Sequence, residues 1–439
     1  MSVGPVPAGY EVSHGKIMAR IVMKFGGTSV ANLERIHNVA RHVKREVDAG
    51  HEVAVVVSAM SGKTNELVDW VQNMPKVAGA DSPFYDAREY DAVVASGEQV
   101  TSGLLAIALQ SMGINARSWQ GWQIAIKTDN AHGAARIQEI DGADIIRRMG
   151  EGQVAVVAGF QGIGPDNRIA TLGRGGSDTS AVAIAAGIKA DRCDIYTDVD
   201  GVYTTDPRIE SRARRLEKVS YEEMLEMASL GAKVLQTRSV ELAMAKRVPV
   251  RVLSSFIEPD AAGVLPEKSG TLICDEEEIV EKRIVSGVTM SRDEARISLL
   301  GLPDSVDRPA EVFTRLAEAN VNVDMIVQSP SRTEGTVNLT FTTGRRDALR
   351  AAELMREGQA GIGFQDIRVD EDVAKVSVIG VGMRSHAGVA QTMFRALADK
   401  GIKFQAISTS EIKISVLIDA AYAELAVRAL HSAYELEAV

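Results

Sequence analysis

Cysteine is nearly absent from this chain, since Cys193 and Cys274 are its two cysteines among 439 residues. Two cysteines cannot build the disulfide framework of a small secreted domain, so a reducing cytoplasm is the expected compartment. Positive charge is also in deficit, because 49 Lys and Arg face 59 Asp and Glu, a formal net charge of −10. An acidic chain without a basic stripe excludes nucleic acid as the expected main partner.

Long apolar runs are missing as well, and none approaches the roughly 20 residues that a membrane helix needs. We therefore expect no membrane partner. Residues 1–20 lack both a charged start and a long apolar stretch, so we interpret them as a flexible leader rather than a secretory signal. The seven histidines are scattered, and no spacing indicates a metal site.

From residue 21 the chain alternates between apolar strands and helices. Strands are predicted at 21–23, 52–58, 154–160, 193–197 and 248–252, and helices near 97–112, 177–188 and 221–246. Continuous apolar strands are typical of a parallel sheet that is buried on both faces. The pattern therefore predicts a three-layer α/β domain over 21–256.

The rest of the chain contains a linker and an internal repeat. Residues 257–285 begin with a Pro- and Gly-rich stretch that has no helical period. The segment 296–302 then returns as 375–381, and each copy is predicted as strand, helix, strand, strand, helix. Two small α+β domains, at 286–365 and 366–439, are therefore expected to follow the α/β domain.

The first candidate site is the stretch KFGGTS at 24–29, between a strand and a helix. Gly26 and Gly27 would let backbone N–H groups approach phosphate oxygens, and Lys24 adds a full positive charge. The alternative is an ordinary glycine turn beside a surface lysine.

The second candidate is TLGRGGSDTS at 171–180, which has three glycines within four residues. Such a loop indicates that something approaches its backbone closely. Arg174 could hold a carboxylate through two parallel hydrogen bonds, and Asp178 could hold an ammonium, order Lys24 or help to bind a metal. The simpler alternative is a helix capped by Ser177 or Asp178.

Three weaker signals complete the set. In YTDVDGVYTTDPR at 196–208, Tyr203 could contact a base or ribose and Arg208 a phosphate, although a polar hairpin-like loop is the favoured interpretation of this segment taken alone. Glu98 is either a ligand of an ammonium group or a first-turn acid favoured by the helix dipole. Lys233 is either a phosphate contact or a solvated charge.

Together these segments resemble the aspartate kinases of the amino-acid kinase superfamily, over essentially 21–439. KFGGTS, GFQG at 159–162, the 171–181 loop and the 196–208 segment stand in that family's order and approximate spacing. GEQ at 97–99 and SEIKIS at 410–415 favour the monofunctional form. The repeated tail resembles a pair of ferredoxin-like ACT domains.

The resemblance implies a role for each matching residue. Lys24, Arg174 and Asp178 would be catalytic. The aspartate site would comprise Thr64, Glu98, Arg136, Ile137, Arg174, Gly175, Gly176 and Ser177. The ATP site would comprise Lys24, Phe25, Gly26, Gly27, Ser58, Thr197, Asp198, Tyr203, Arg208, Lys233 and Val234.

The implied reaction is phosphorylation of the β-carboxylate of L-aspartate by ATP with Mg²⁺, the first step towards lysine, threonine and methionine. That carboxylate has a free pKa near 4, so at neutral pH it is already a nucleophile and needs no general base. The protein's task is then to bring several negative charges together and neutralise the group in transfer.

The ACT-like tail implies feedback by lysine, threonine or both, and a homo-oligomer built as a dimer or a multiple of one. The effector residues would be Asp307, Asn322, Asp324 and Gln328. The sequence departs from the family pattern at two places: Pro309-Ala310 replaces the frequent Pro-Gly, and Lys403-Phe404-Gln405 replaces Asn-Ile-Glu. These departures could retune or silence the effector response.

Two other functions compete with this one. Another carboxylate kinase of the superfamily would share the glycine loops but not the ACT pair. A catalytically silent amino-acid sensor would keep the tail and lose turnover, and the presence of Lys24, Glu98 and Arg174 speaks against such decay.

Overall fold

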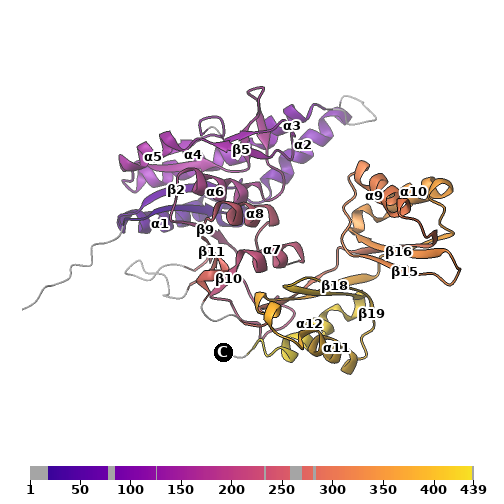
Figure 1. Cartoon of the computed structure of the whole chain (residues 1–439). Coiled ribbons are helices and arrows are strands. Elements are labelled where there is room, and N and C mark those ends of the chain that lie inside the picture. Colours follow the sequence, from indigo (N-terminus) through magenta and orange to yellow (C-terminus); the bar gives the residue numbers. More distant parts are fainter. Residues whose placement is uncertain are drawn as a thin grey trace, which may run out of the picture. The chain divides into compact units, whose positions relative to one another are not determined.

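The computed structural model describes residues 18–77, 85–124, 126–231, 234–257, 269–279 and 283–437. The chain divides into two compact units (Figure 1). Unit 1 holds the described residues within Met1–Asp198 and Val248–Glu267, and unit 2 those within Val199–Arg247 and Lys268–Val439. The division falls inside the predicted α/β domain, between Asp198 and Val199.

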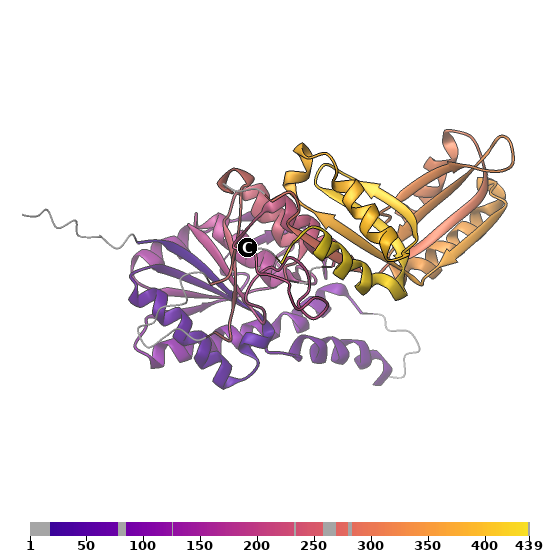
Figure 2. The ribbon, with the colours of Figure 1, turned by 90° about the horizontal axis from the view of Figure 1, so that it is seen from below.

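Unit 1 is built on a parallel sheet, as predicted from the apolar strands. Within unit 1 the strand order is β11-β9-β1-β2-β6-β3, and every neighbouring pair is parallel. Figure 2 shows the strands of this unit side by side in one sheet. These strands are β1 (Arg20–Phe25), β2 (Glu52–Val57), β3 (Ala116–Trp119), β6 (Val154–Ala158), β9 (Arg192–Thr197) and β11 (Val250–Ser254).

Helices cover both faces of this sheet, which confirms the three-layer α/β class. Alternate residues of β1, β2 and β6 pack with α1 and α4 in one apolar core, while α6 contacts β1, β2 and β9. The helices are α1 (Leu33–Asp48), α2 (Lys63–Val77), α3 (Ala87–Val94), α4 (Ser96–Ser111), α5 (Ala143–Gly150) and α6 (Gly176–Gly187).

A second, smaller sheet of unit 1 supports the loops at the candidate site. Its order is β5-β4-β7-β8, with β4 at Ile126–Thr128, β5 at Ile137–Ile140, β7 at Gln161–Ile163 and β8 at Ile169–Thr171. Strand β8 ends where the glycine-rich loop 172–176 begins.

The start of unit 2 corrects one predicted element, because the helix expected over 221–246 is two helices. These are α7 (Tyr221–Ser229) and α8 (Thr237–Lys246), and β10 (Lys218–Ser220) precedes them and pairs with β12 (Thr271–Cys274). Gly231 has φ +114°, and a Cβ there would lie 2.2 Å from the carbonyl oxygen of Met290. A helix cannot continue through a backbone conformation that only glycine adopts readily.

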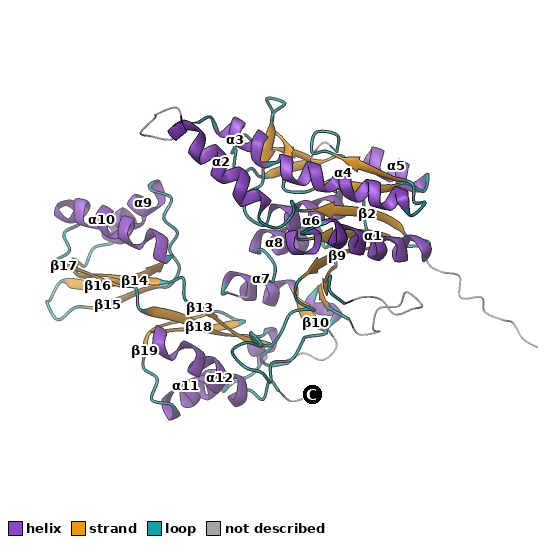
Figure 3. Ribbon diagram, turned by 180° about the vertical axis from the view of Figure 1, so that it is seen from behind, coloured by secondary structure: helices purple, strands orange, loops and turns teal. Residues whose placement is uncertain are grey.

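The repeated tail forms two antiparallel four-stranded sheets, each with two helices on one face (Figure 3). In the first sheet the order is β15-β16-β14-β17, and α9 and α10 cover it. Its elements are β14 (Ala295–Pro303), α9 (Asp307–Glu318), β15 (Ile326–Pro330), β16 (Thr336–Thr343), α10 (Arg345–Ile362) and β17 (Asp366–Asp370).

In the second sheet the order is β13-β18-β20-β19, and α11 and α12 cover it. Its elements are β13 (Gly287–Ser291), β18 (Val373–Ile379), α11 (Val389–Asp399), β19 (Phe404–Thr409), β20 (Lys413–Asp419) and α12 (Ala423–Ala433). β13 pairs with β18 and β17 pairs with β14, so each sheet takes one strand from beyond its predicted range. The first small domain is thus inserted between β13 and β18 of the second.

Within unit 2, Glu223 ties α7 to the second small sheet. One carboxylate oxygen closes a capping box with Ser220, and the other accepts hydrogen bonds from Ser286 Oγ (2.6 Å) and Val381 N (3.0 Å). Glu223 is 2% exposed, so its removal would leave several buried donors without an acceptor.

We expect Glu223→Ala to destabilise unit 2 by about 3 kcal/mol, because unsatisfied buried donors cost about 1–3 kcal/mol each. Thermal unfolding followed by calorimetry measures the effect. Glu241→Ala, at an exposed position of α8, is the matched control and should stay within about 0.5 kcal/mol of the parent. Equal stability of the two variants would contradict the role given to Glu223.

Candidate functional site

Lys24 and Asp178 meet at the carboxyl end of β1. Lys24 Nζ lies 2.5 Å from Asp178 Oδ1, and both residues are at least 92% buried. The sequence-based suggestion that Asp178 orders Lys24 is therefore seen in the structure. A buried ion pair of this kind holds a positive charge in place while keeping it compensated.

The glycines after Lys24 leave space beside this amine. A Cβ at Gly26 would lie 3.5 Å from Lys24 Nζ, and a Cβ at Gly27 would lie 3.1 Å from the carbonyl oxygen of Ala59. The Gly26 N–H donates to Tyr196 O at 3.4 Å, so Gly26 contributes room rather than a free amide. A short 3-10 turn at Gly27–Val30 separates the glycines from α1, so no long helix starts at this loop.

Each of the three glycines of the 172–176 loop is required for its own physical reason. Gly173 (φ +77°) and Gly175 (φ +69°) take left-handed backbone conformations on either side of Arg174. At Gly176 a Cβ would lie 2.8 Å from the Phe160 ring and 2.9 Å from Leu172 Cβ. The Arg174 side chain is exposed and has no ion pair or hydrogen bond with the described residues. The loop thus presents a guanidinium group that no described residue compensates.

Two predicted residues from separate loops meet through their hydroxyl groups. Ser58, after β2, and Ser177, in the first turn of α6, have their Oγ atoms 2.8 Å apart. The Ser58 N–H donates to the carbonyl oxygen of Phe25, which ties the ends of β1 and β2 together. The segments after β1 and β2 therefore meet the first turn of α6 at the carboxyl ends of neighbouring parallel strands, where α/β proteins commonly bind ligands.

Glu98 is far more buried than a first-turn acid of an exposed helix. The residue is 3% exposed, and its Oε1 accepts a hydrogen bond from the Ala59 N–H at 2.9 Å. Its Oε2 is buried and has no hydrogen-bond partner among the described residues. Burial raises the pKa of Glu98 to about 7, although the Ala59 N–H and the nearby Lys24 charge oppose this shift. A buried acceptor without a donor indicates a place for a cationic ligand group.

The remaining predicted aspartate-site residues lie around this centre in unit 1. Thr64 is half-buried in the first turn of α2. The Arg136 N–H donates to Asp129 Oδ1, while its side chain is exposed. Ile137, the first residue of β5, packs on the small apolar cluster that includes Leu172 of the glycine-rich loop.

Sequence reasoning missed two residues of this region, Asp91 and His132. The Asp91 carboxylate is fully buried and accepts hydrogen bonds from both the 129–136 and the 171–176 segments. The sequence DAREYDAVV at 86–94 contains several acids and gives no sign that this one is buried. The one sequence feature that pointed to Asp91 was its spacing of seven residues, two helical turns, from Glu98.

The structure divides the predicted nucleotide residues between the units. Thr197 and Asp198 end the unit 1 segment, and Thr197 Oγ1 donates to Asp198 Oδ1. In unit 2, Tyr203 OH donates to Asp200 Oδ1 at 2.9 Å. Arg208 forms a bidentate ion pair with Asp206, so its positive charge is already compensated. Val234 lies in unit 2 after α7, and Lys233 falls outside the described residues.

The predicted effector residues lie on one end and one edge of the first small sheet. Asp307 begins α9, Asn322 and Asp324 follow α9, and Gln328 is in the edge strand β15. All four are exposed. Asp324 Oδ2 is paired with Lys375 Nζ at 2.5 Å, so its carboxylate has a partner within the protein.

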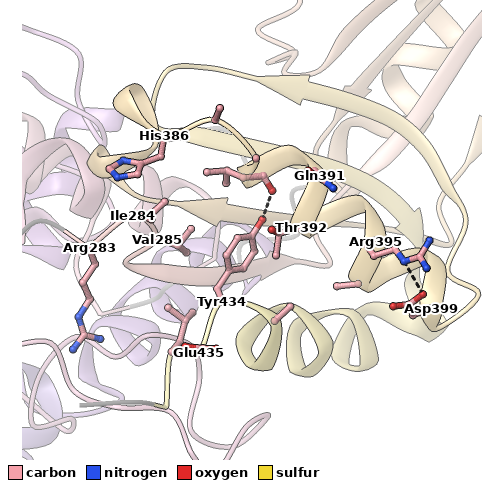
Figure 4. A pocket seen from close by; sticks show the side chains of 16 residues that line it. Arg283, Ile284, Val285, His386, Gln391, Thr392, Arg395, Asp399, Tyr434 and Glu435 are labelled. Carbon is pink, nitrogen blue, oxygen red and sulfur yellow. Dashed lines mark hydrogen bonds and ion pairs between the residues drawn. The ribbon is translucent and has the colours of Figure 1, made fainter.

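A cavity of about 890 Å³ lies in the second small domain (Figure 4). Residues of α11, the turn after α12 and the segment 283–285 line it, and the Tyr434 hydroxyl donates to Val389 O within it. None of the predicted catalytic, nucleotide or effector residues borders this cavity. It therefore has no part in the site described above.

One helical stretch, Ala87–Ser111, is long and apolar enough to cross a membrane. Half of its most apolar window is buried inside the protein, as expected for a core helix. The stretch comprises α3 and α4, which carry Asp91 and Glu98.

Comparison with known proteins agrees with this geometry. The amino acid kinase family matches residues 19–254, and an ACT domain matches 376–434. The chain is 52% identical to an aspartokinase of Pseudomonas aeruginosa over 423 residues, 96% of this chain and 98% of that protein. It is 43% identical to an aspartokinase of Corynebacterium glutamicum over 423 residues, 95% and 97% of the two chains.

Solved structures resemble the chain over nearly its whole length. Aspartokinase III of E. coli in complex with aspartate and ADP superposes with a TM-score of 0.75 at 28% identity, covering 94% of this chain and 99% of that one. The same enzyme in complex with lysine and aspartate gives a TM-score of 0.72, covering 94% and 98%. The protein therefore belongs to the amino acid kinase family, and within it to the aspartate kinases with ACT domains.

Proposed function

We propose that this chain transfers the γ-phosphoryl group of ATP to the β-carboxylate of L-aspartate, giving 4-phospho-L-aspartate in the cytoplasm. The proposal rests chiefly on the burial of the Glu98 carboxylate. Its buried Oε2 has no partner among the described residues and suits an α-ammonium group, and Arg174, which has no ion pair within that part of the chain, suits an α-carboxylate. An amino acid held at both groups would leave its side-chain carboxylate to react.

Charge neutralisation is the main work of such a site, because the attacking group and the phosphates are all anionic. Lys24 is held by Asp178 beside the space left by Gly26, where it can approach a phosphate oxygen. The Ser58 and Ser177 hydroxyls can donate to the same group or orient it. No side chain has to remove a proton, since the β-carboxylate is ionised at neutral pH.

Mg²⁺ fits this donor set as a companion of the nucleotide. The described residues contain no cluster of three or more His, Cys, Asp or Glu side chains that could hold a metal ion. Mg²⁺ is commonly held by one or two carboxylates together with substrate phosphates and water, and Asp178 would supply the carboxylate. When bound, the ion would offset the charge of the phosphates.

We also propose that the nucleotide site is lined by Thr197, Asp198, Tyr203, Arg208, Lys233 and Val234. Asp206 compensates Arg208, and Asp200 accepts from the Tyr203 hydroxyl, so both side chains would exchange partners to bind ATP. The backbone of this segment is a more direct candidate for nucleotide contacts than either side chain.

We also infer feedback control and assembly through the tail. A catalytic domain ending near 256 and two ACT domains is the proposed division, with β13 and β17 exchanged as described. Edge strands β15 and β19 expose Ile326 and Phe404 on the two sheets, which suits pairing between copies in a dimer or a multiple of one. Lysine, threonine or both are the proposed effectors.

Lys24→Ala and Arg174→Ala should separate transfer from substrate binding. We expect Lys24→Ala to lower kcat on the order of 100-fold or more, because it removes a charge aimed at the group in transfer. Arg174→Ala should instead raise the KM for aspartate. Hydroxylamine trapping of the acyl phosphate measures both, with Lys44→Ala as the control, because the Lys44 side chain of α1 is largely exposed. An unchanged aspartate KM in Arg174→Ala would refute the pocket assignment.

Glu98 should make aspartate binding depend on pH. With a pKa of about 7 in the free enzyme, Glu98 is ionised above pH 7 and becomes neutral below it. Since only the ionised form attracts an ammonium group, kcat/KM for aspartate should fall about tenfold per unit below that pKa. Profiles at saturating ATP should show this fall in the parent and lose it in Glu98→Gln. A parent profile that is flat from pH 5.5 to 8.5 would exclude this role.

Millimolar lysine plus threonine should lower the rate of acyl-phosphate formation. Asp324→Asn should weaken that inhibition if Asp324 belongs to the effector site, while Asp304→Asn, an exposed acid of the same domain, should not. Rates that stay constant at millimolar levels of both amino acids would show that Ala310 and Gln405 accompany a silenced tail.

A further inference from the structure

Asp91 of α3 is a fully buried carboxylate that collects donors from two separate loops. It accepts from Thr171 N (3.0 Å), Thr171 Oγ1 (2.5 Å) and Gly133 N (3.1 Å), and His132 Nδ1 lies 2.7 Å from its Oδ2. Burying a carboxylate is costly unless it is hydrogen-bonded on several sides. With this many hydrogen bonds, the Asp91 carboxylate is held firmly in one position.

The donors belong to the two loops that border the proposed aspartate site. Thr171 is the last residue of β8 and precedes Arg174 by three positions. Gly133 lies in the 129–136 loop, and its carbonyl oxygen would be 3.2 Å from a Cβ at Gly173. The Ala135 N–H also donates to Thr171 O at 2.9 Å. The two loops are therefore locked to each other, and Asp91 joins both to α3.

His132 extends this network. A carboxylate can only accept, so the Nδ1 atom facing Asp91 carries a proton. The His132 side chain is 6% exposed, and its Nε2 has no hydrogen-bond partner in the described part of the chain. Asp91 thus fixes the orientation of the ring as well as the backbone of the loop.

We propose that Asp91 is a positioning residue that sets the affinity for the amino-acid substrate by holding the Thr171–Gly176 loop, and with it Arg174, in place. Asp91 acts through this loop and does not touch the substrate. The inference rests on the proposed role of Arg174 in binding the substrate carboxylate. A displacement of the guanidinium by about 1 Å would be enough to weaken a two-pronged contact strongly.

Steady-state kinetics of the full-length enzyme with Asp91→Asn test the proposal. Asparagine keeps the shape but replaces one acceptor oxygen with a donor, which faces other donors here. We expect the KM for aspartate to rise about 10- to 100-fold, with the KM for ATP within about twofold of the parent. Equal changes in both KM values would overturn the proposal, because a general loss of structure would affect both substrates.

Thr171 supplies a second test that does not remove the buried charge. Thr171→Val keeps the shape and loses the hydroxyl donor, whereas Thr171→Ser keeps the donor. We expect Thr171→Val to raise the aspartate KM and Thr171→Ser to behave like the parent. Should Asp91→Asn fail to fold, this pair decides the question, and equal kinetics for the two Thr171 variants would refute the proposal.

A double-mutant cycle with Arg174 separates positioning from mere stability. If Asp91 acts through Arg174, Asp91→Asn should change the aspartate KM little in an Arg174→Ala background. Multiplicative effects would show that Asp91 acts elsewhere and would overturn the inference. If Arg174→Ala alone leaves the KM unchanged, the proposed role of Arg174 fails first. If Arg174→Ala raises the KM and Asp91→Asn does not, only the present inference fails.

Discussion

The contact between Lys24 and Asp178 is the constraint on which the site depends. A lysine at the end of a buried parallel strand has lost much of its water, so its charge needs an anion nearby. Asp178 supplies one from the first turn of α6, and this fixes how α6 lies on β1. In the absence of nucleotide the pair keeps the charge compensated. A phosphate that arrives beside Gly26 would find a cation already oriented towards it.

The same demand for charge compensation would make the rest of the proposed site selective for its ligand. Arg174 and one oxygen of Glu98 are left without partners among the described residues, while Arg208, Tyr203 and Asp324 have partners close by. Uncompensated groups favour a ligand that brings both opposite charges, as an amino acid does. The buried group, Glu98, would be the more discriminating of the two, because a buried acceptor without a donor costs more free energy than an exposed one.

Much of the fold followed from the sequence, since long apolar strands and glycine-rich turns are local signals. The parallel sheet and the repeated tail were accessible in this way. The contact between Lys24 and Asp178 joins distant parts of the chain, and the sequence offered it only as one of three roles for Asp178. Asp91 was not accessible, because its role depends on donors about 40 and 80 positions away along the chain. Glu98 was a candidate from the sequence, but its raised pKa comes from burial that no local pattern shows. The helix break at Gly231 depends on the carbonyl group of Met290, which is also distant in sequence.

The division of the chain between Asp198 and Val199 bears on how the tail could control catalysis. Segment 199–247 belongs to the matched kinase family region, yet it forms one compact unit with both small domains. Within that unit the Val288 N–H donates to Thr204 O, and Thr204 Oγ1 lies 2.9 Å from His431 Nε2 of α12. Thr204 adjoins Tyr203, so a shift of the second ACT sheet would carry the proposed nucleotide segment with it.

Because one small domain is inserted into the other, a change at the proposed effector residues of the first ACT domain could also reach the second ACT domain. The first ACT domain joins the second through two short connections, 292–294 and 371–372. Lys375 lies beside them, with its Nζ 2.6 Å from Glu294 and 2.5 Å from Asp324. An effector that drew Asp324 away would leave a buried lysine with one partner fewer at this joint. Because a buried charge tolerates such a loss poorly, the joint would have to rearrange. Strand β18 pairs with β13, and β13 is bonded to Thr204, so this path would carry the rearrangement to the proposed nucleotide segment.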